Sequence, residues 1–339
     1  MKISAAPRRA LLAGPMLAGA LAAGVLLAPA ARADAPAPPG AVTVQGGPLS
    51  KTTMERLLLI DAARMGNRVV AVGDRGYIVY SDDNGESWQR ARVAAPAQLP
   101  LLTSVYFSDP KTGWAVGHDA VILATADGGE NWTQQFSAPG EQKPLLSVLF
   151  LDPATGFAVG AYGSFYATAD GGKTWNARKI IADDKHLNAI AKVAGDKLLI
   201  VGESGTLLLS GDGGKTWTPL ASPYKGSFFG ALAADDGAVI VYGLRGKIFR
   251  STDLGRTWKP IVNASVATLL GGTRMPDGAL VIAGNAGTVL VSRDGGQSFT
   301  PLATGATKAY AKPLLGAPNA VLLLGEAGAR DVLMPSAKR

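Results

Sequence analysis

One eight-residue pattern recurs six times in this chain and constrains its fold more than any other feature. The pattern is Ser/Thr-x-Asp-x-Gly-x-(Ser/Thr/Asn)-Trp/Phe, and residues 210–217 are a clear copy. The copies begin at residues 81, 125, 168, 210, 251 and 292, so that successive copies are 44, 43, 42, 41 and 41 residues apart. Spacing this regular predicts an architecture of stacked structural repeats.

Each copy is predicted to form a tight turn between two strands, called here the Asp turn. The Asp side chain can accept hydrogen bonds from nearby backbone N–H groups, and the glycines permit positive φ. The aromatic residue that ends the pattern is large enough to pack between neighbouring repeats. The pattern contains no nucleophile, so a structural role is expected for the following residues: Asp83, Asp127, Asp170, Asp212, Asp253, Asp294, Trp88, Trp132, Trp175, Trp217, Trp258 and Phe299.

Four short apolar or alternating segments fill each repeat, and the first repeat has them at residues 57–60, 68–72, 77–80 and 88–93. Short strands joined by Gly-rich turns predict a four-stranded antiparallel sheet. Six such units are complete, whereas a seventh, from about residue 309, lacks the Asp turn and the fourth strand. Repeated four-stranded sheets arranged radially make a β-propeller, so we predict an all-β, seven-bladed propeller.

The last blade needs a fourth strand, because an open edge strand is a liability. Residues 42–49 precede the first unit and are otherwise unassigned. We therefore expect them to pair with residues 331–335 and to close the ring. Residues 52–63 are expected to form at most a short helical turn.

The N-terminus has the features of an export signal. Lys2, Arg8 and Arg9 form a basic start, an apolar run covers residues 11–28, and small residues stand on either side of Arg32. Cleavage after Ala33 is expected, with a membrane anchor as the alternative and with both ordinary secretion and twin-arginine export open. The predicted organisation is a signal peptide (1–33), a linker (34–41) and one propeller domain (42–339). The mature protein is then periplasmic or secreted and, lacking a further long apolar run, does not span a membrane.

Charge and composition narrow the possible partners. The formal net charge is +7, but the first 33 residues contain four basic residues and no acid, which leaves 29 basic and 26 acidic residues in the rest of the chain. This balance argues against nucleic acid as a partner. The chain has no cysteine, which excludes disulfides, a thiol nucleophile and a Cys zinc site. We predict no metal, no cofactor and a monomer.

A second motif, Gly-x-x-Gly, follows the second strand of each unit, with Ala120 in place of the closing glycine in the second unit. Because strands alternate in direction, this turn lies on the same face as the connections between blades, opposite the Asp turns. The residues between the glycines vary, as expected of a scaffold that presents a binding surface. The predicted binding residues are Asp74, Arg75, His118, Asp119, Tyr162, Glu203, Arg245, Asn285 and Glu326.

The connections between blades add polar residues to the same face: Gln98, Glu141, Lys143, Asp183, Asp184, Lys185, His186, Tyr224 and Lys225. Arg75, Tyr162 and Arg245 rank highest for binding, since Arg and Tyr are enriched in interface hot spots. His118 beside Asp119 could act as an acid–base pair, although the tip of a hairpin is also polar simply because it is solvated.

The complete repeat, as in residues 146–150, 155–160 and 165–175, resembles the Asp-box (BNR) propellers. The combination of Gly-(Trp/Phe)-Ala-Val-Gly with Asp-Gly-Gly-x-x-Trp is most similar to the photosystem II stability/assembly factor family and its relatives in non-photosynthetic bacteria. The resemblance covers about residues 45–335. It implies a non-enzymatic protein that binds subunits or folding intermediates of a membrane complex.

This resemblance also implies a basic patch for partner binding, and here the chain departs from the family. Arg75, Arg245 and several lysines are scattered among acids such as Asp74 and Glu203. The other branch of Asp-box propellers, the sialidases, uses three arginines and an Arg-Ile-Pro motif, which is absent here. We therefore predict an exported assembly scaffold for a protein of an envelope or membrane complex, with no catalytic residue. The alternative is a carbohydrate-binding or sialidase-like glycosidase propeller.

Overall fold

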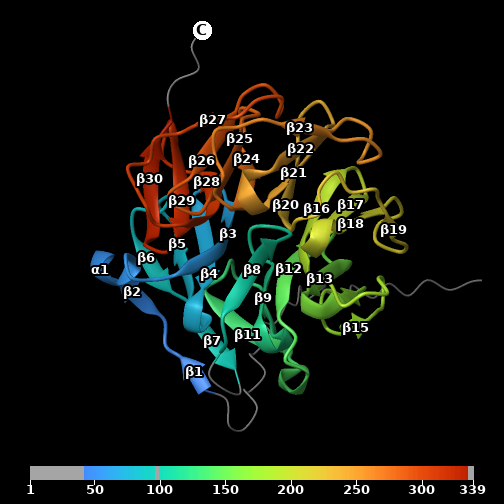
Figure 1. Cartoon of the computed structure of the whole chain (residues 1–339). Helices are drawn as coiled ribbons and strands as arrows, with labels where there is room; N and C mark the ends of the chain where they lie inside the picture. The colour runs from blue at the N-terminus through green and yellow to red at the C-terminus, as the bar shows by residue number, and fades with distance from the viewer. Residues whose placement is uncertain (1–41, 96–98, 335–339) are drawn as a thin grey trace, which may run out of the picture. The chain divides into compact units, whose positions relative to one another are not determined.

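The protein is a seven-bladed β-propeller, as the repeats predict. The structure, a computed structural model, describes residues 42–95 and 99–334, which all lie in one compact unit, residues 38–339. Its seven sheets follow one another around a ring in chain order, from blue β3 to red β30 (Figure 1). The predicted signal peptide, the predicted linker and Gln98 lie outside the described residues, and they stay predictions.

Each blade is built from consecutive strands, numbered from the ring axis outwards. The first strands are β3 (Leu59–Met65), β8 (Leu102–Phe107), β12 (Leu145–Phe150), β16 (Leu187–Ala194), β20 (Phe228–Ala233), β24 (Leu269–Arg274) and β28 (Tyr310–Leu315). The second strands are β4 (Arg68–Gly73), β9 (Gly113–Gly117), β13 (Gly156–Gly160), β17 (Lys197–Gly202), β21 (Val239–Gly243), β25 (Leu280–Gly284) and β29 (Ala320–Gly325).

Most of the outer strands, all but β11 and β30, are shorter than the inner ones. The third strands are β5 (Ile78–Ser81), β10 (Ile122–Thr125), β14 (Phe165–Thr168), β18 (Leu207–Ser210), β22 (Ile248–Ser251), β26 (Val289–Ser292) and β30 (Gly328–Leu333). The fourth strands are β6 (Trp88–Arg90), β11 (Asn131–Phe136), β15 (Asn176–Ala177), β19 (Thr218–Pro219), β23 (Lys259–Ile261) and β27 (Thr300–Pro301).

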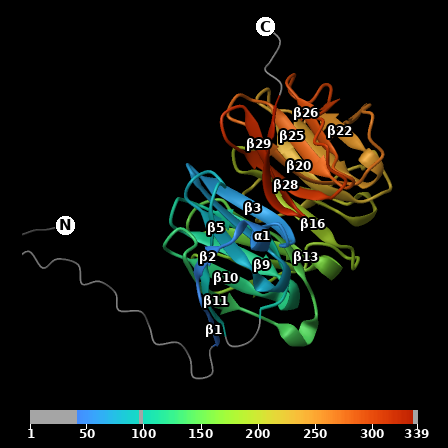
Figure 2. The same cartoon turned by 90° about the vertical axis from the view of Figure 1, so that its left-hand side faces the viewer.

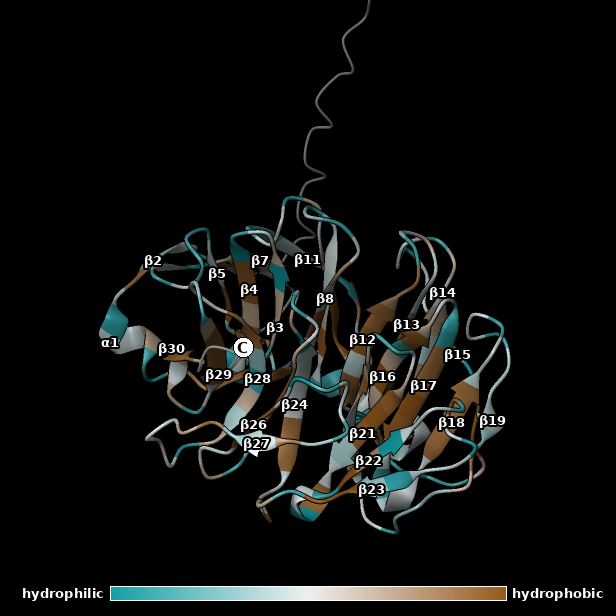
Figure 3. Cartoon of the chain, turned by 90° about the horizontal axis from the view of Figure 1, so that it is seen from above, coloured by the Kyte–Doolittle hydropathy of each residue, from teal (hydrophilic) through white to brown (hydrophobic). Residues whose placement is uncertain are grey.

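The second strands form the core of the ring. Every residue of β9, β13, β21 and β25 is buried, because each blade is covered on both faces by its neighbours. This explains why these segments are continuous apolar runs and do not alternate. Figure 3 shows β13 and β17 in brown, with teal to white connections around them.

The aromatic residues of the Asp turns pack between blades, as predicted. Trp132 of blade 2 is 1% exposed and belongs to a cluster with Val70 and Val72 of blade 1. Its indole Nε1 donates a hydrogen bond to the Gly129 carbonyl oxygen at 2.9 Å, so its one polar atom is satisfied. Each Asp turn therefore helps to fasten its blade to the preceding one.

The predicted closure of the ring by residues 42–49 needs correction. These residues form β1 (Val42–Val44) and β2 (Gly47–Leu49), which pair with the outer edges of blades 2 and 1. The last sheet contains only β28, β29 and β30 among the described residues. The prediction assumed that only the last blade has a free edge strand. The outer strands of blades 1 and 2 also accept a further strand.

The outer strand of blade 1 explains this pairing. After β6 the chain continues as β7 (Arg92–Ala95), which crosses to blade 2 and pairs in parallel with β11. β6 and β7 therefore offer one long edge across two blades. β1 and β2 pair with it antiparallel in a single register, from Val42 opposite Ala95 to Leu49 opposite Trp88. Figure 2 shows β2 and β1 following one another along this side of the molecule.

Side chains and a short helix hold the seam between blades 7 and 1. The Asp61 carboxylate of β3 lies 3.0 Å from the Lys312 ammonium of β28, and Arg64 donates to the Leu315 carbonyl oxygen at 2.6 Å. Helix α1 (Lys51–Met54) places the buried Met54 in a cluster with residues of β28 and β29. The short helical turn expected within residues 52–63 corresponds to α1, which ends at Met54, and the later part of that range belongs to β3, which begins at Leu59. No helix within the described ranges is long and apolar enough to cross a membrane.

Candidate functional site

The propeller has two faces with different connections. One face carries the turns between second and third strands and the connections between blades, and we call it the loop face. Backbone hydrogen bonds tie these two sets together: Gly163 N–H donates to the Lys185 carbonyl oxygen at 2.8 Å, and Gly287 N–H donates to that of Lys308 at 2.9 Å. The other face carries the Asp turns, and we call it the Asp-turn face.

On the Asp-turn face the carboxylate of each Asp turn accepts hydrogen bonds from donors of its own turn. Asp212 accepts hydrogen bonds from the Ser210 hydroxyl at 2.8 Å, the Thr216 hydroxyl at 2.6 Å and the Thr216 N–H at 2.9 Å. The Ser210 hydroxyl oxygen in turn accepts from Gly214 N–H at 2.8 Å. These bonds, led by the one from the Thr216 hydroxyl, lower the pKa of Asp212 to about 2. Such an Asp is a permanent hydrogen-bond acceptor and is poorly suited to proton transfer near neutral pH.

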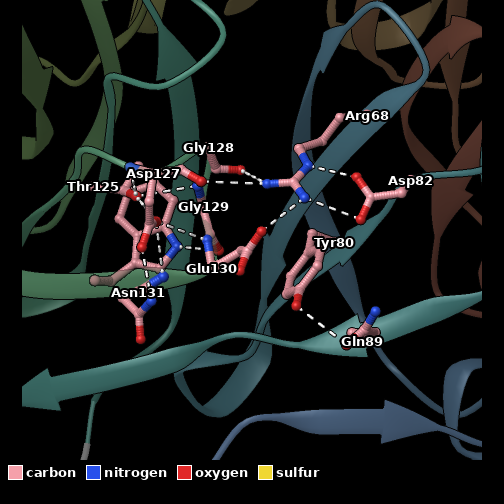
Figure 4. Close-up of polar contacts among 11 residues, drawn as sticks. Arg68, Tyr80, Asp82, Gln89, Thr125, Asp127, Gly128, Gly129, Glu130 and Asn131 are labelled. Atoms are coloured by element: carbon pink, nitrogen blue, oxygen red, sulfur yellow. Dashed lines mark hydrogen bonds and ion pairs between the residues drawn. The ribbon is translucent and has the colours of Figure 1, made fainter.

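Arginines connect successive Asp turns across the blades. Arg68 of β4 bonds Asp82 of its own blade at 2.6 Å and reaches the Gly128 carbonyl oxygen and the Glu130 carboxylate of blade 2 at 3.2 and 2.9 Å (Figure 4). Arg178 and Arg250 donate in the same way to carbonyl oxygens of the Asp turns of blades 4 and 6. These three arginines thus link neighbouring blades on this face.

The turns of the loop face have a strained backbone. In six of them a non-glycine residue has positive φ: Arg75 (52°), Asp119 (57°), Tyr162 (55°), Ser204 (53°), Arg245 (57°) and Ala286 (54°). In most of these turns a glycine with positive φ follows, which is the geometry of a type I′ turn. A side chain other than Gly, Asn or Asp costs about 1–2 kcal/mol in this conformation. Several predicted binding residues therefore occupy positions that are unfavourable for folding.

Blade 2 shows that this turn geometry does not require the closing glycine. Ala120 stands at that position and still has φ of 50°. It is fully buried and belongs to a cluster with residues of blades 2 and 3. Alanine in place of the closing glycine therefore raises the free-energy cost of the turn conformation but leaves its geometry unchanged.

The predicted binding residues are spread around the loop face. Six of them, Arg75, His118, Tyr162, Arg245, Asn285 and Glu326, are exposed, and the other three, Asp74, Asp119 and Glu203, are partly exposed. No hydrogen bond or ion pair joins His118 to Asp119, although both lie within the described residues. Asp119 instead accepts a hydrogen bond from Ala138 N–H through its backbone oxygen. The acid–base pair considered from the sequence is therefore not formed.

One group of predicted residues does come together, between blades 3 and 4. The rings of Tyr162 and His186 lie edge to face with centroids 5.0 Å apart. The His186 Nδ1 atom lies 3.2 Å from the Glu203 carboxylate, which also accepts a hydrogen bond from the His186 N–H. A pocket of about 310 Å³ next to Tyr162 contains the buried Ser164 hydroxyl, which has no hydrogen-bond partner among the described residues. The sequence places these residues on one face, but their contact depends on the fold.

Large apolar side chains are exposed mainly on the loop face. Five are exposed within the described residues, and four of them, Leu58, Tyr162, Val262 and Val266, belong to loop-face turns and connections. Only Leu333 lies at the opposite end of a strand. Sequence reasoning missed Val262 and Val266, although their place in a connection between β23 and β24 was a usable signal. An ordered surface that exposes apolar side chains is typical of a binding surface.

A cavity of about 430 Å³ lies on the ring axis and is lined by the first strands of all seven blades. Its lining includes one carboxylate, Asp61, and that carboxylate is paired with Lys312. Glycoside hydrolysis ordinarily uses two carboxyl groups on either side of the bond to be cleaved. Within the described residues no group of three or more His, Asp or Glu side chains could hold a metal ion.

Comparison with known families confirms the resemblance to Asp-box propellers of the photosystem II assembly factor kind. The family model described as photosynthesis system II assembly factor YCF48 matches residues 135–298. The BNR/Asp-box repeat matches residues 79–90. No curated protein matches the chain.

Solved structures of several propellers are similar in fold. YCF48 bound to D1 peptide is 20% identical, with a TM-score of 0.67 over 86% of this chain and 97% of that chain. YCF48 from Cyanidioschyzon merolae is 19% identical, with a TM-score of 0.64 over 86% and 99%. The GH74 xyloglucanase from Xanthomonas campestris is 14% identical, with a TM-score of 0.61 over 84% of this chain and 53% of that chain. At these identities the likeness shows the fold alone.

Proposed function

We propose that this protein is an exported, non-enzymatic binding scaffold that holds a subunit of an envelope or membrane complex on its loop face. The partner docks on the turns between second and third strands, with Tyr162 as an anchor and with Arg75 as a peripheral contact. Export follows from the N-terminal signal expected from the sequence, and it leads to the periplasm or the exterior.

The observation that carries this proposal is the exposure of large apolar side chains mainly on one face, where four of the five in the described residues lie. Tyr162 has 53% of its surface exposed and is held in place by the His186 ring beneath it. Tyr is one of the residues most enriched in interface hot spots, which bind through a large and rigid contact area. Its positive φ adds a folding cost at this position, as is common at sites kept for binding.

The comparisons support the same class of function. The chain matches the family model of an assembly factor, and a solved propeller of that kind is bound to a peptide of another protein. The axis cavity supports the glycosidase alternative poorly, because its lining has a single, ion-paired carboxylate. A surface that binds a protein does not require two carboxyl groups close together, as a glycosidase does.

In-cell cross-linking tests the proposal. The tagged protein would be cross-linked, purified and analysed by mass spectrometry, and the captured subunit would then be titrated against the purified variants. Tyr162→Ala is expected to weaken the binding of the captured subunit at least tenfold, as for a hot spot of about 2 kcal/mol. Arg75→Glu is expected to have a smaller effect in the same direction.

Two control variants lie on the opposite side of the molecule. Leu333→Ala removes an apolar side chain that is 75% exposed, and Arg256→Glu reverses an exposed charge on the Asp-turn face. Both should capture the wild-type set of proteins. Capture that is unchanged by Tyr162→Ala, or turnover of a glycan by the purified protein, would contradict the proposal.

A further inference from the structure

Two valines on the loop face are almost entirely exposed. Val262 is 91% exposed and Val266 is 86% exposed, the highest values among large apolar residues in the described ranges. Both lie in the connection from β23 to β24, between blades 5 and 6. An aliphatic side chain in water loses about 1.5–3 kcal/mol relative to a buried one, so two of them on one short connection need an explanation.

Hydrogen bonds hold this connection in a defined conformation. The Asn263 side-chain amide donates to the Gly246 carbonyl oxygen at 2.8 Å, and its own oxygen accepts from Ser265 N–H at 2.9 Å. The Ser265 hydroxyl accepts from Ala267 N–H at 3.1 Å and lies 3.5 Å from the Thr288 hydroxyl. The connection is anchored to blades 5 and 6 while its two valines point away from the protein.

Exposed cations lie on the neighbouring turns and connections of the loop face, and together with the two valines they are called the valine sector. Its members are Val262, Val266, Lys225, Arg245, Lys247 and Lys308. Hydrogen bonds link these turns and connections: the Tyr224 hydroxyl, next to Lys225, donates to the Leu244 carbonyl oxygen at 3.5 Å, and the Lys308 backbone oxygen accepts from Gly287 N–H.

The cations of this sector have no acidic partner. None of the four forms an ion pair with any described residue. On blades 1–4 of the same face, by contrast, Arg75, Lys143 and Lys185 pair with Asp74, Glu141 and Asp183. The loop-face segments of blades 5 and 6, residues 219–228, 243–248, 261–269, 284–289 and 299–309, contain no acid at all. The loop face is therefore divided into a charge-paired part and a part with exposed valines and cations that form no ion pair among the described residues. At the border of this second part, the Glu326 carboxylate of blade 7 accepts a hydrogen bond from Ala309 N–H, next to Lys308.

We propose that the valine sector docks on an anionic lipid surface, with Val262 and Val266 inserted at the level of the headgroups. Insertion removes their aliphatic surface from water, and the four cations meet lipid phosphates at the same time. Each Lys or Arg close to an anionic membrane contributes about 1 kcal/mol, and apolar insertion adds to this. A single-stranded nucleic acid would instead require aromatic side chains on which bases stack, and the sector exposes aliphatic ones.

This inference goes beyond the proposed function, because lipid docking needs no protein partner. It orients the protein with blades 5 and 6 of the loop face against the bilayer, so that Tyr162 of blade 3, on the same face, lies near the membrane surface. A scaffold so oriented would meet subunits that are already inserted in the bilayer.

Vesicle flotation with the mature protein tests the proposal. The vesicles are made of phosphatidylcholine alone or of phosphatidylcholine with phosphatidylglycerol, at low and at high salt. The protein is expected to float with the anionic vesicles only, and less at high salt, because screening shortens the reach of exposed charges. Neutralising one cation, as in Arg245→Gln or Lys308→Gln, should lower the partition constant roughly fivefold. The double variant with Val262→Asp and Val266→Asp should lower it further.

Matched controls separate the valine sector from general charge. Lys143→Gln/Lys185→Gln removes two paired cations of the same face, and Leu333→Asp introduces an acid at another exposed apolar residue. Both variants should float like the wild type. Because Val262 and Val266 are almost fully exposed, their variants should keep the wild-type melting temperature.

Three results would overturn the lipid docking. They are equal flotation with both vesicle types, unchanged flotation of the valine variant, and full competition by free inorganic phosphate, which would indicate an anion site. If the valine variant loses the cross-linked protein partner but still floats, the sector is a protein interface. Failure to float with partner capture intact would leave the proposed function standing without this inference.

Discussion

The two faces of this propeller are ends of the same strands, yet their turns satisfy the backbone and the side chains differently. On the Asp-turn face, glycines take most of the positive φ angles, with Asn84 and Leu254 as exceptions, and each carboxylate is surrounded by donors of its own turn, as at Asp212. On the loop face, residues such as Tyr162 and Arg245 take positive φ themselves. Both side chains are largely exposed to solvent, although the Tyr162 ring also contacts His186 at the edge of the next blade.

This difference separates the two tasks of a repeat scaffold. The Asp-turn face joins neighbouring blades through buried aromatic residues and arginines such as Arg68, so its residues are constrained by the ring. The loop face contributes less to holding the ring and is free to vary from blade to blade. Three experiments, ordered by the size of the expected effect, test this difference between the two faces.

The largest effect is expected for Trp132→Ala on the Asp-turn side. The substitution leaves a cavity between blades 1 and 2, and it should lower the free energy of unfolding by about 3–5 kcal/mol. Tyr162→Ala on the loop face should change it by less than about 0.5 kcal/mol, because most of that ring is already in water. Urea denaturation of both variants measures the contrast, and similar losses would show that the faces do not differ in this way.

An intermediate effect is expected from acid. The pKa values of Asp170, Asp212 and Asp253 are lowered from 3.8 to about 2 by hydrogen bonds within their turns. Their contribution to stability is therefore complete above about pH 4 and is lost as the pH falls towards 2.

Thermal unfolding of Asp212→Asn and of the wild type between pH 7 and pH 2 measures this contribution. The variant should be less stable at pH 7, and the difference should shrink as the pH falls towards 2. A difference that stays constant over that range would mean that the charge of Asp212 plays no part.

The smallest effect is expected for Ser204→Gly on the loop face. Ser204 is exposed and has φ of 53°, so glycine should relieve the strain and raise the free energy of unfolding by about 0.5–1 kcal/mol. The control is Gly205→Ala in the same turn, where the added Cβ would lie 2.1 Å from the Tyr224 carbonyl oxygen. The control should be clearly destabilised, and a destabilised Ser204→Gly would contradict the assignment of strain.

Much of the fold follows from local patterns. The six Asp turns, together with the incomplete seventh unit from about residue 309, indicate the number of blades. Each Asp turn also fixes the place of its aromatic residue, since it is closed by hydrogen bonds within eight residues. The alternation of strand direction then assigns the turns to two faces. Such features depend on neighbours in sequence, so they are readable without the structure.

The remaining features depend on which edges and surfaces stay uncovered. The pairing of β1 and β2 with β7 and β6 was missed, because a free edge is a property of the assembled sheet. The contact of Tyr162 with His186 joins two blades at a distance that no local pattern encodes. The exposure of Val262 and Val266 was missed for the same reason, since apolar residues after a strand usually continue into the core.

The pairing of the N-terminal strands with blades 1 and 2 has a consequence for the order in which the molecule can be made. In a propeller whose last blade takes its fourth strand from the N-terminus, that blade cannot form until both ends of the chain are present. Here every sheet is assembled from residues that are near in sequence, and the N-terminal pairing is complete once residue 95 has emerged. Blades can therefore form one after another as the chain leaves a ribosome or a translocation channel, with the seam between Asp61 and Lys312 closing last.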